Sequence, residues 1–303
     1  MRMTPFWTDQ FPRPDDLPCT ESIPTEVDVA IVGSGYTGLN AARVLAQSGA
    51  QVAVLERHTI GWGASSRNGG MATPGIKQSL KEIIHRYGKA KGREFWQASL
   101  DAIDLLEQII RDEKIDCDWA RNGHIGLAYK PAHFEHQREL TRWYKQEFGH
   151  ETTLVVPSDL RTEIGTDAFY GGLADEYSGG LHPAKYVFGL ARAVAGHGAQ
   201  LCEHTDVTHI ERNHSGFQVS TDRGPIKAQE VLVATNGYTD RLVPKFKSKV
   251  FPVGSYIIVT EPLPSELKKE LSPKGRMFYD TKNFLNYFCL TPDGRMLWGG
   301  FQK

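Results

Sequence analysis

Near the start of the chain, two apolar runs flank a glycine-rich turn and a segment with helical patterning. Residues 27–32 form an apolar run, which predicts a buried parallel strand. Residues 37–48 predict a helix that ends at Gly49, since glycine is common just past a helix C-terminus. Residues 51–55 are again mostly apolar and predict a second strand. Strand, helix and strand within roughly 30 residues make one βαβ unit.

Helical patterning dominates the middle of the chain, and short strands follow it. Apolar side chains recur near helical spacing in residues 93–114, which predicts an amphipathic core helix. His182 and Pro183 open another predicted helix that runs to about Gly196, because proline suits a first turn. Further helices are predicted over 78–87 and 133–148, and strands over 119–128, 200–203, 207–211, 216–221, 231–234, 250–260 and 286–298. This order predicts two domains whose segments alternate along the chain.

The turn between the first strand and the first helix carries a dinucleotide-binding fingerprint. Gly33, Gly35 and Gly38 form a GxGxxG motif, and Glu56 ends the second strand. The first glycine permits the tight turn, the second lets a diphosphate approach the backbone, and the third lets helix and strand pack closely. The helix N-terminus offers free N–H groups to phosphate oxygens, while the carboxylate accepts hydrogen bonds from ribose hydroxyls and repels a 2′-phosphate. The motif alone leaves NAD and FAD open.

A second polar loop follows the βαβ unit. Residues 61–70 read Gly-Trp-Gly-Ala-Ser-Ser-Arg-Asn-Gly-Gly and offer backbone N–H groups, hydroxyls, a guanidinium and an amide. Such a loop suits a second contact with a large, flat, charged ligand, which favours FAD over a nicotinamide cofactor. A surface loop without a ligand is the alternative.

The composition of the chain mainly argues against certain partners and sites. The 303 residues carry 35 basic and 36 acidic side chains, a balance that disfavours a nucleic-acid partner. Cys19, Cys117, Cys202 and Cys289 form no CxxC pair, so we expect free thiols in a reducing compartment and no metal site. The first 28 residues lack the apolar core of a signal sequence, and no run is long enough to span a bilayer. We therefore expect a cytoplasmic protein without a membrane span.

These stretches resemble the D-amino-acid-oxidase-type family of FAD-dependent oxidoreductases. The resemblance rests on residues 27–56 and 61–70, on Gly-Gly-Leu-His-Pro-Ala at 179–184 and on Ala-Thr-Asn-Gly-Tyr-Thr at 234–239. The form of the 61–70 loop is most similar to the gamma-glutamylputrescine oxidase branch. The resemblance implies an α/β fold, in which a Rossmann-type FAD-binding domain is interleaved with an α+β substrate domain built on a mainly antiparallel sheet.

The resemblance also implies domain boundaries. The FAD-binding domain would comprise residues 1–88 and 178–246, and the substrate domain residues 89–177 and 247–303. Relatives continue beyond the position of Lys303, so the resemblance implies a C-terminal truncation that removes the closing segment of the FAD-binding domain. Relatives also commonly carry arginine where this chain has Cys289.

Residue roles follow from the same resemblance. The glycine turn would hold the diphosphate, residues 56 and 57 would lie by the adenosine, and residues 65–68 would line the phosphates and approach the flavin. Val207 would touch the adenine side through its backbone, and a helix cap is an additional role for Asn236. The implied cofactor-binding residues are Gly33, Ser34, Gly35, Thr37, Gly38, Glu56, Arg57, Ser65, Ser66, Arg67, Asn68, Val207, Thr235, Asn236 and Gly237.

The implied reaction is oxidation of the C–N bond of a small amine or amino acid, similar to gamma-glutamylputrescine. A hydride passes to flavin N5, the imine is hydrolysed, and oxygen is the expected acceptor. No catalytic acid or base is predicted, because a neutral amine needs neither for hydride loss. Tyr256, Tyr287 and Phe288 are candidates for an aromatic pocket wall, with ordinary sheet core as the alternative.

Other hypotheses stay open from the sequence. A catalytically inactive flavin-binding or partner-binding remnant of the family is the main alternative, and a nicotinamide dehydrogenase is a third. His182 is predicted as a turn or cap residue rather than a catalyst. The sequence does not indicate an oligomeric state.

Overall fold

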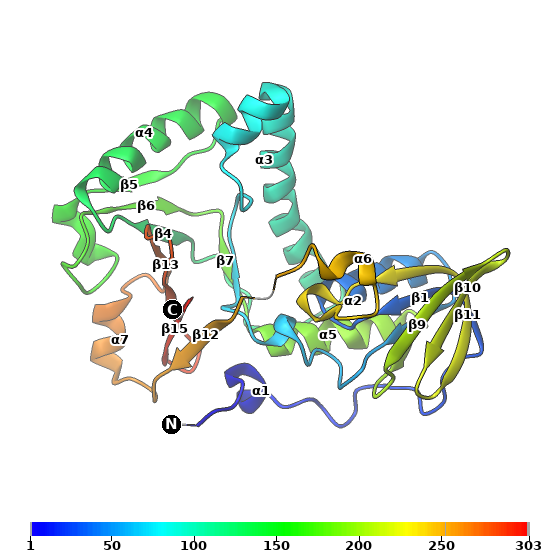
Figure 1. Ribbon diagram of the computed structural model, residues 1–303. Helices are drawn as coiled ribbons and strands as arrows, with labels where there is room; N and C mark the ends of the chain where they lie inside the picture. The colour runs from blue at the N-terminus through cyan, green and yellow to red at the C-terminus, as the bar shows by residue number, and fades with distance from the viewer. Residues whose placement is uncertain (1, 252, 302–303) are drawn as a thin grey trace. The chain divides into compact units, whose positions relative to one another are not determined.

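The chain folds into two compact units, each built from segments that are separate in sequence. The computed structural model describes residues 2–251 and 253–301. Unit 1 comprises Met1–Asn68, Asp112–Cys117 and His182–Val253, and unit 2 comprises Gly69–Arg111, Asp118–Leu181 and Gly254–Lys303. Figure 1 traces the elements of both units along the chain.

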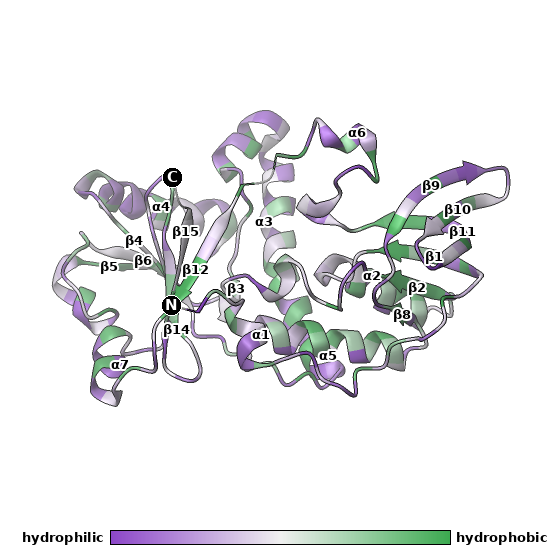
Figure 2. Cartoon of the chain, turned by 60° about the horizontal axis from the view of Figure 1, so that its bottom comes forward, coloured by the Kyte–Doolittle hydropathy of each residue, from purple (hydrophilic) through white to green (hydrophobic). Residues whose placement is uncertain are grey.

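Unit 1 is built on a six-stranded sheet (Figures 1 and 2). The order is β8-β2-β1-β11-β10-β9, with bounds Gln200–Cys202, Val52–Leu55, Glu26–Val32, Gly224–Val233, Gly216–Thr221 and Val207–Asn213. The first four strands of that order run parallel, whereas β10 pairs antiparallel with β11 and β9. Helices α2 (Tyr36–Gln47) and α5 (Pro183–Gly196) pack against each other within this unit.

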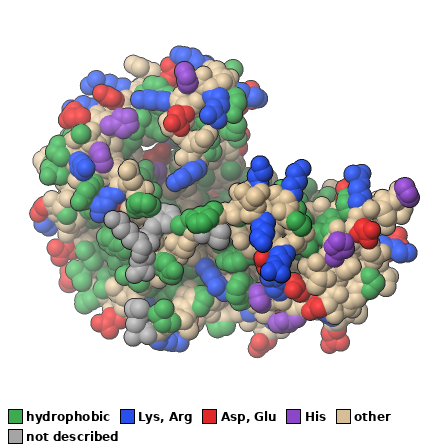
Figure 3. All heavy atoms as spheres, viewed as in Figure 1, with side chains coloured by type: hydrophobic (Ala, Val, Ile, Leu, Met, Phe, Trp, Pro, Cys, Tyr) green, Lys and Arg blue, Asp and Glu red, His purple; other side chains and the backbone are tan. Residues whose placement is uncertain are grey.

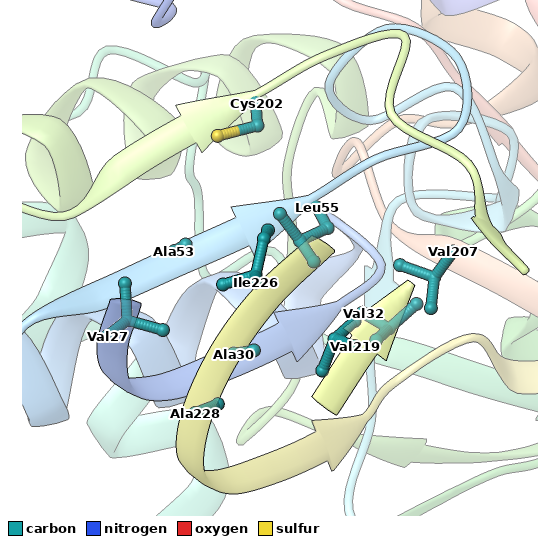
Figure 4. Close-up of a cluster of buried hydrophobic side chains, with 10 residues drawn as sticks. All are labelled: Val27, Ala30, Val32, Ala53, Leu55, Cys202, Val207, Val219, Ile226 and Ala228. Carbon is teal, nitrogen blue, oxygen red and sulfur yellow. The ribbon is translucent and has the colours of Figure 1, made fainter. Parts of the chain in front are cut away.

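The apolar run at 27–32 lies in the core of unit 1. Ala30 and Ile31 on β1 are fully buried, as are Ala53 and Val54 on β2. Burial at successive positions means that both faces of these strands are covered, which explains why the run does not alternate with polar residues. Figure 4 shows buried side chains that β1, β2 and β8 to β11 contribute to one cluster.

Unit 2 is built on a seven-stranded sheet of order β12-β15-β14-β13-β4-β6-β5. Its strands span Ser255–Val259, Met296–Phe301, Tyr287–Leu290, Met277–Asp280, His124–Leu127, Gly172–Asp175 and Thr153–Val155. Every neighbouring pair is antiparallel except β13 and β4, so the sheet is mainly antiparallel. The unit also holds α4 (Pro131–Phe148), α7 (Ser265–Leu271) and most of α3 (Leu80–Asp112).

Short elements complete both units. They are α1 (Phe6–Gln10), η1 (Ala64–Ser66), β3 (Met71–Ala72), η2 (Pro157–Thr162), β7 (Gly179–Gly180), η3 (Asn236–Tyr238) and α6 (Pro244–Lys247).

Several predicted elements differ from the observed ones for local reasons. The helices predicted at 78–87 and 93–114 are one element, α3, which Gly88 interrupts with a φ of 84°. The strand predicted at 119–128 is confined to β4, because Asp118 and Gly123 before it take positive φ values.

The predicted role of His182 is confirmed: it is the N-cap of α5, and its Nδ1 accepts a hydrogen bond from Lys185 N at 3.3 Å.

The boundaries between the units also differ from the predicted ones. The first crossing lies after Asn68 rather than at residue 88, because β3 pairs with β7 of unit 2. Residues 112–117 return to unit 1, and the last two crossings follow Leu181 and Val253 rather than residues 177 and 246. The segments of the two units alternate along the chain, and the first crossing falls just before the short strand β3.

The described residues show neither a membrane-spanning helix nor a metal-binding cluster. Basic and acidic side chains are interspersed over the face in Figure 3, in keeping with a formal net charge of −1. Within the described part of the chain, no helix has the length and apolarity to cross a bilayer. The same residues contain no cluster of His, Cys, Asp and Glu placed to hold a metal ion.

Candidate cofactor-binding site

A cavity of about 620 Å³ opens in unit 1 where the ends of β1, β2 and β11 meet. Its volume falls within the range of about 300–1,000 Å³ that is typical of ligand sites. The carboxyl ends of neighbouring parallel strands are where α/β sheets bind ligands. The cavity is lined by residues 32–37, 55–58, 62–65, 68, 205–207, 233–236, 238, 239 and 242.

The glycines of the turn before α2 meet different geometric requirements. Gly33 has a φ of +105°, and a Cβ there would lie 2.7 Å from Ala234 O. A Cβ at Gly38 would lie 2.0 Å from Gly33 O, so only glycine lets the helix pack this closely on the strand. Gly35 has an ordinary φ of −75°, but a Cβ there would lie 2.9 Å from Ser65 Oγ. Conformation and space both explain the first glycine, and space alone explains the other two.

The residues at the N-terminus of α2, Gly35 to Thr37, line the cavity. The N-cap residue makes no side-chain hydrogen bond, and the first turn carries no acidic residue that would offset the positive end of the helix. Tyr36 N donates to Ser65 Oγ at 3.0 Å, so an oxygen acceptor already suits this position. A turn in which two glycines leave the backbone uncovered beside a helix N-terminus fits a diphosphate.

Glu56 follows β2, and protein donors fix its carboxylate at the cavity wall. Oε2 accepts hydrogen bonds from Ser34 Oγ at 2.6 Å and from Ser34 N at 3.1 Å. Oε1 accepts from His58 N at 3.0 Å. Ser34 Oγ in turn accepts from Gly61 N at 3.1 Å, which links the carboxylate to the 61–70 loop. The residues present therefore fit both the diphosphate and the ribose of a dinucleotide.

Most of the predicted binding residues line this cavity, and some do not. The lining includes Gly33, Ser34, Gly35, Thr37, Glu56, Arg57, Ser65, Asn68, Val207, Thr235 and Asn236. Gly38 packs against the Gly33 carbonyl outside the cavity lining, and Gly237 does not line the cavity. Ser66 is fully buried and donates to Gly61 O at 2.6 Å, so it holds the loop instead. Arg67 places its guanidinium over the Trp62 ring, 4.2 Å from the ring centre.

Two further predicted residues have partners that define their surroundings. Arg57 Nε donates to Asp206 Oδ1 at 2.7 Å, and both side chains are partly exposed. Asn236 begins η3 with a φ of +48°, but the N-cap of that turn is Thr235. The helix-cap role considered for Asn236 is therefore not observed, and Thr235 occupies the N-cap position without a capping hydrogen bond from its side chain.

Aromatic residues at the cavity were missed by the sequence reasoning. His58, Trp62 and Tyr238 all belong to the lining. The ring centres of His58 and Trp62 are 4.1 Å apart, and those of Trp62 and Tyr238 are 5.8 Å apart. The available signal was a large aromatic residue inside a glycine-rich loop, where small residues otherwise prevail.

The predicted aromatic wall belongs to unit 2, and its members have different surroundings. Phe288 is 4% exposed and stacks on Trp298 with ring centres 4.3 Å apart, so it lies in the core of that unit, as the alternative reading expected. Tyr287 precedes it on β14 and faces the opposite way, where its ring covers Gly299 and Gly69. Tyr256 is 60% exposed. Burial raises the pKa of Tyr287, and it raises the pKa of Cys289 to about 12, so both stay protonated at neutral pH.

Comparison with known proteins decides the family. The sequence profile described as FAD dependent oxidoreductase (DAO) matches residues 28–303. The chain belongs to this family. The probable oxidoreductase OrdL of Haemophilus influenzae is 34% identical over 278 residues, which cover 90% of this chain and 64% of the relative. The gamma-glutamylputrescine oxidoreductase of Escherichia coli is 34% identical over 274 residues, with the same coverage of 90% and 64%.

Solved structures support the fold of this family member. The glycine oxidase of Geobacillus kaustophilus has a TM-score of 0.71 at 22% identity, covering 92% of this chain and 72% of its own. The L-proline dehydrogenase of P. horikoshii also has a TM-score of 0.71, at 21% identity over 93% of this chain and 71% of its own. The predicted fold class is thereby confirmed, and FAD is confirmed as the cofactor of the family. The chain spans 64% of the length of the two sequence relatives above.

Proposed function

We propose that this chain binds FAD in the cavity of unit 1. The diphosphate would rest on the turn at Gly33 and Gly35, against the N–H groups that begin α2. A ribose hydroxyl would donate to Glu56, whose carboxylate is already oriented by Ser34 and His58. The observation that carries the proposal is the turn at a helix N-terminus in which Gly33 and Gly35 place no side chain, in a chain whose family uses FAD.

The proposal extends to the reaction. The protein would oxidise the C–N bond of a small amine or amino acid, and we propose a gamma-glutamylputrescine-like amine, because a relative of that name shares 34% identity. Bound FAD supplies a hydride acceptor, and oxygen would regenerate it. The residues of the chain would bind and orient the FAD and the amine. No catalytic acid or base is assigned, since a neutral amine loses hydride without one.

Aromatic side chains of unit 2 are the proposed substrate contacts. Tyr256 is exposed and Tyr287 is half-buried beside glycines, so both can present a ring to a ligand. Aromatic faces attract ammonium groups and cover alkyl chains, which are the two features of a polyamine derivative. The core position of Phe288 leaves it outside this role.

Absorbance of the purified chain tests both parts of the proposal. We expect two near-visible flavin bands, which gamma-glutamylputrescine bleaches under anaerobic conditions and air restores. Flavin bands that no amine bleaches would refute the oxidase and leave a flavin-binding protein. A colourless chain that takes up no added FAD would refute the cofactor assignment as well.

A further inference from the structure

Trp62 is a large aromatic residue held in a fixed position at the cavity wall. Trp62 lines the cavity and is 37% exposed, so part of the indole surface is accessible to a ligand. The Arg67 guanidinium lies over the indole, 4.2 Å from its centre, and the His58 ring centre is 4.1 Å away. These contacts restrict the indole before any ligand arrives, so little entropy is lost when a ligand contacts it.

Tyr238 reaches the same place from a different part of the chain. It follows β11, lines the cavity and is 48% exposed. Its ring meets Trp62 edge-on, with an interplanar angle of 67°. A Cβ at Gly63 would lie 3.3 Å from Tyr238 Cε2, so the glycine beside Trp62 leaves room for this ring. The loops after β2 and β11 therefore meet through two aromatic rings.

The position of these rings identifies the part of the ligand that they would contact. The glycine turn and Glu56 line the same cavity, and they recognise a diphosphate and a ribose. His58 contacts the Trp62 ring and donates its backbone N–H to Glu56 Oε1, so the rings lie on the Glu56 side of the cavity, where the adenosine diphosphate part of a dinucleotide would bind. A ligand that covers the exposed apolar area of these rings removes it from water, which stabilises the complex.

We propose that Trp62 and Tyr238 form an aromatic clamp that covers the adenosine diphosphate part of the bound cofactor and strengthens its binding. Arg67 is a positioning residue for the clamp, because it contacts the indole and is not part of the cavity lining. This inference rests on the proposed function, since it presumes a dinucleotide in the cavity. It adds binding residues outside the glycine fingerprint.

ADP is the appropriate probe, because it contains the half of FAD that the clamp would cover and lacks the flavin. Calorimetric titration should give a Kd for ADP at least about tenfold weaker in Trp62→Ala and Tyr238→Ala, which corresponds to about 1.4 kcal/mol. Trp62→Phe keeps a ring and should change the Kd less than about threefold. Tyr170→Ala is the matched control, because Tyr170 is also 48% exposed but lies in unit 2.

Tryptophan fluorescence gives a readout that does not need an alanine variant to fold. The chain has six tryptophans, so the difference between wild type and Trp62→Phe isolates the emission of Trp62. We expect ADP to change that emission and to protect it from acrylamide quenching.

Different results would overturn different claims. If the wild type binds ADP while Trp62 emission and quenching stay constant, or if both alanine variants keep the wild-type Kd, the clamp is wrong and the cofactor site stands. If the alanine variants weaken FAD but not ADP, the rings cover the other half of the cofactor. If the wild type binds neither ADP nor FAD, the proposed function and the clamp fail together.

Discussion

Replacing Gly35 by alanine and then by valine separates two reasons for glycine in a turn. The residue has φ −75° and ψ −179°, which any L-amino acid adopts, so substitution costs little backbone strain. The obstacle is space, since a Cβ would lie 2.9 Å from Ser65 Oγ. Pushing that hydroxyl aside breaks its 3.0 Å bond with Tyr36 N, which is worth about 0.5–1.5 kcal/mol.

The valine variant should lose cofactor far more than stability. Its two methyl groups add bulk where the diphosphate meets the N-terminus of α2. We expect the Kd for FAD to rise at least about 100-fold, or about 2.7 kcal/mol, while the free energy of unfolding falls by about 1 kcal/mol. Alanine should lie between the wild type and valine in both quantities.

Flavin fluorescence titration and urea unfolding measure these two quantities separately. Gly196→Ala is the matched control, because no atom lies within 4 Å of a Cβ at that position near the end of α5. Wild-type flavin affinity in the valine variant would refute contact between the diphosphate and this turn. An equal loss of stability and affinity would instead show that the glycine serves folding.

Other predictions concern neighbouring residues. Gly38→Ala should lower the free energy of unfolding by about 2–4 kcal/mol in urea, because its Cβ would meet Gly33 O at 2.0 Å. Glu56→Gln should weaken FAD at least about tenfold in fluorescence titration, because either orientation of the amide turns N–H groups toward a donor, Ser34 on one side or His58 N on the other. Burial lowers the pKa of the His124 imidazole below its ordinary value of 6.5. The neutral imidazole therefore stabilises the fold fully above about pH 6.5, and the free energy of unfolding decreases as the pH falls below that value, by at most about 1.4 kcal/mol per pH unit. His124→Gln should remove that part of the pH dependence in urea unfolding.

Features that depend on a local stretch of chain could be predicted from the sequence. The glycine turn requires a strand before it and a helix after it, and the spacing of Gly33, Gly38 and Glu56 carries all of that information. The role of His182 as an N-cap is equally local, since the proline after it fixes where the helix begins. In these cases a few neighbouring residues determine the geometry.

The 61–70 loop shows where such reasoning stops. Its polar composition predicts one binding surface, yet Ser65 lines the cavity and Ser66 turns inward and donates to Gly61 O. The loop passes through the short helical turn η1, where successive side chains point in different directions. The direction of each residue follows from that turn, which composition does not reveal. The pairing of Trp62 with Tyr238 is harder still, because it depends on where the loop after β11 ends.

The arrangement around Glu56 explains why a carboxylate suits this position better than an amide. An ionised carboxylate offers about four acceptor sites and no donor. Ser34 uses two of them through its N–H and hydroxyl, and His58 N uses a third. About one acceptor site is therefore left on Oε1 for a ribose hydroxyl. Since the protein's own donors already fix the group, a nucleotide would meet an acceptor that needs no further ordering, and binding energy that would otherwise orient the side chain strengthens the complex.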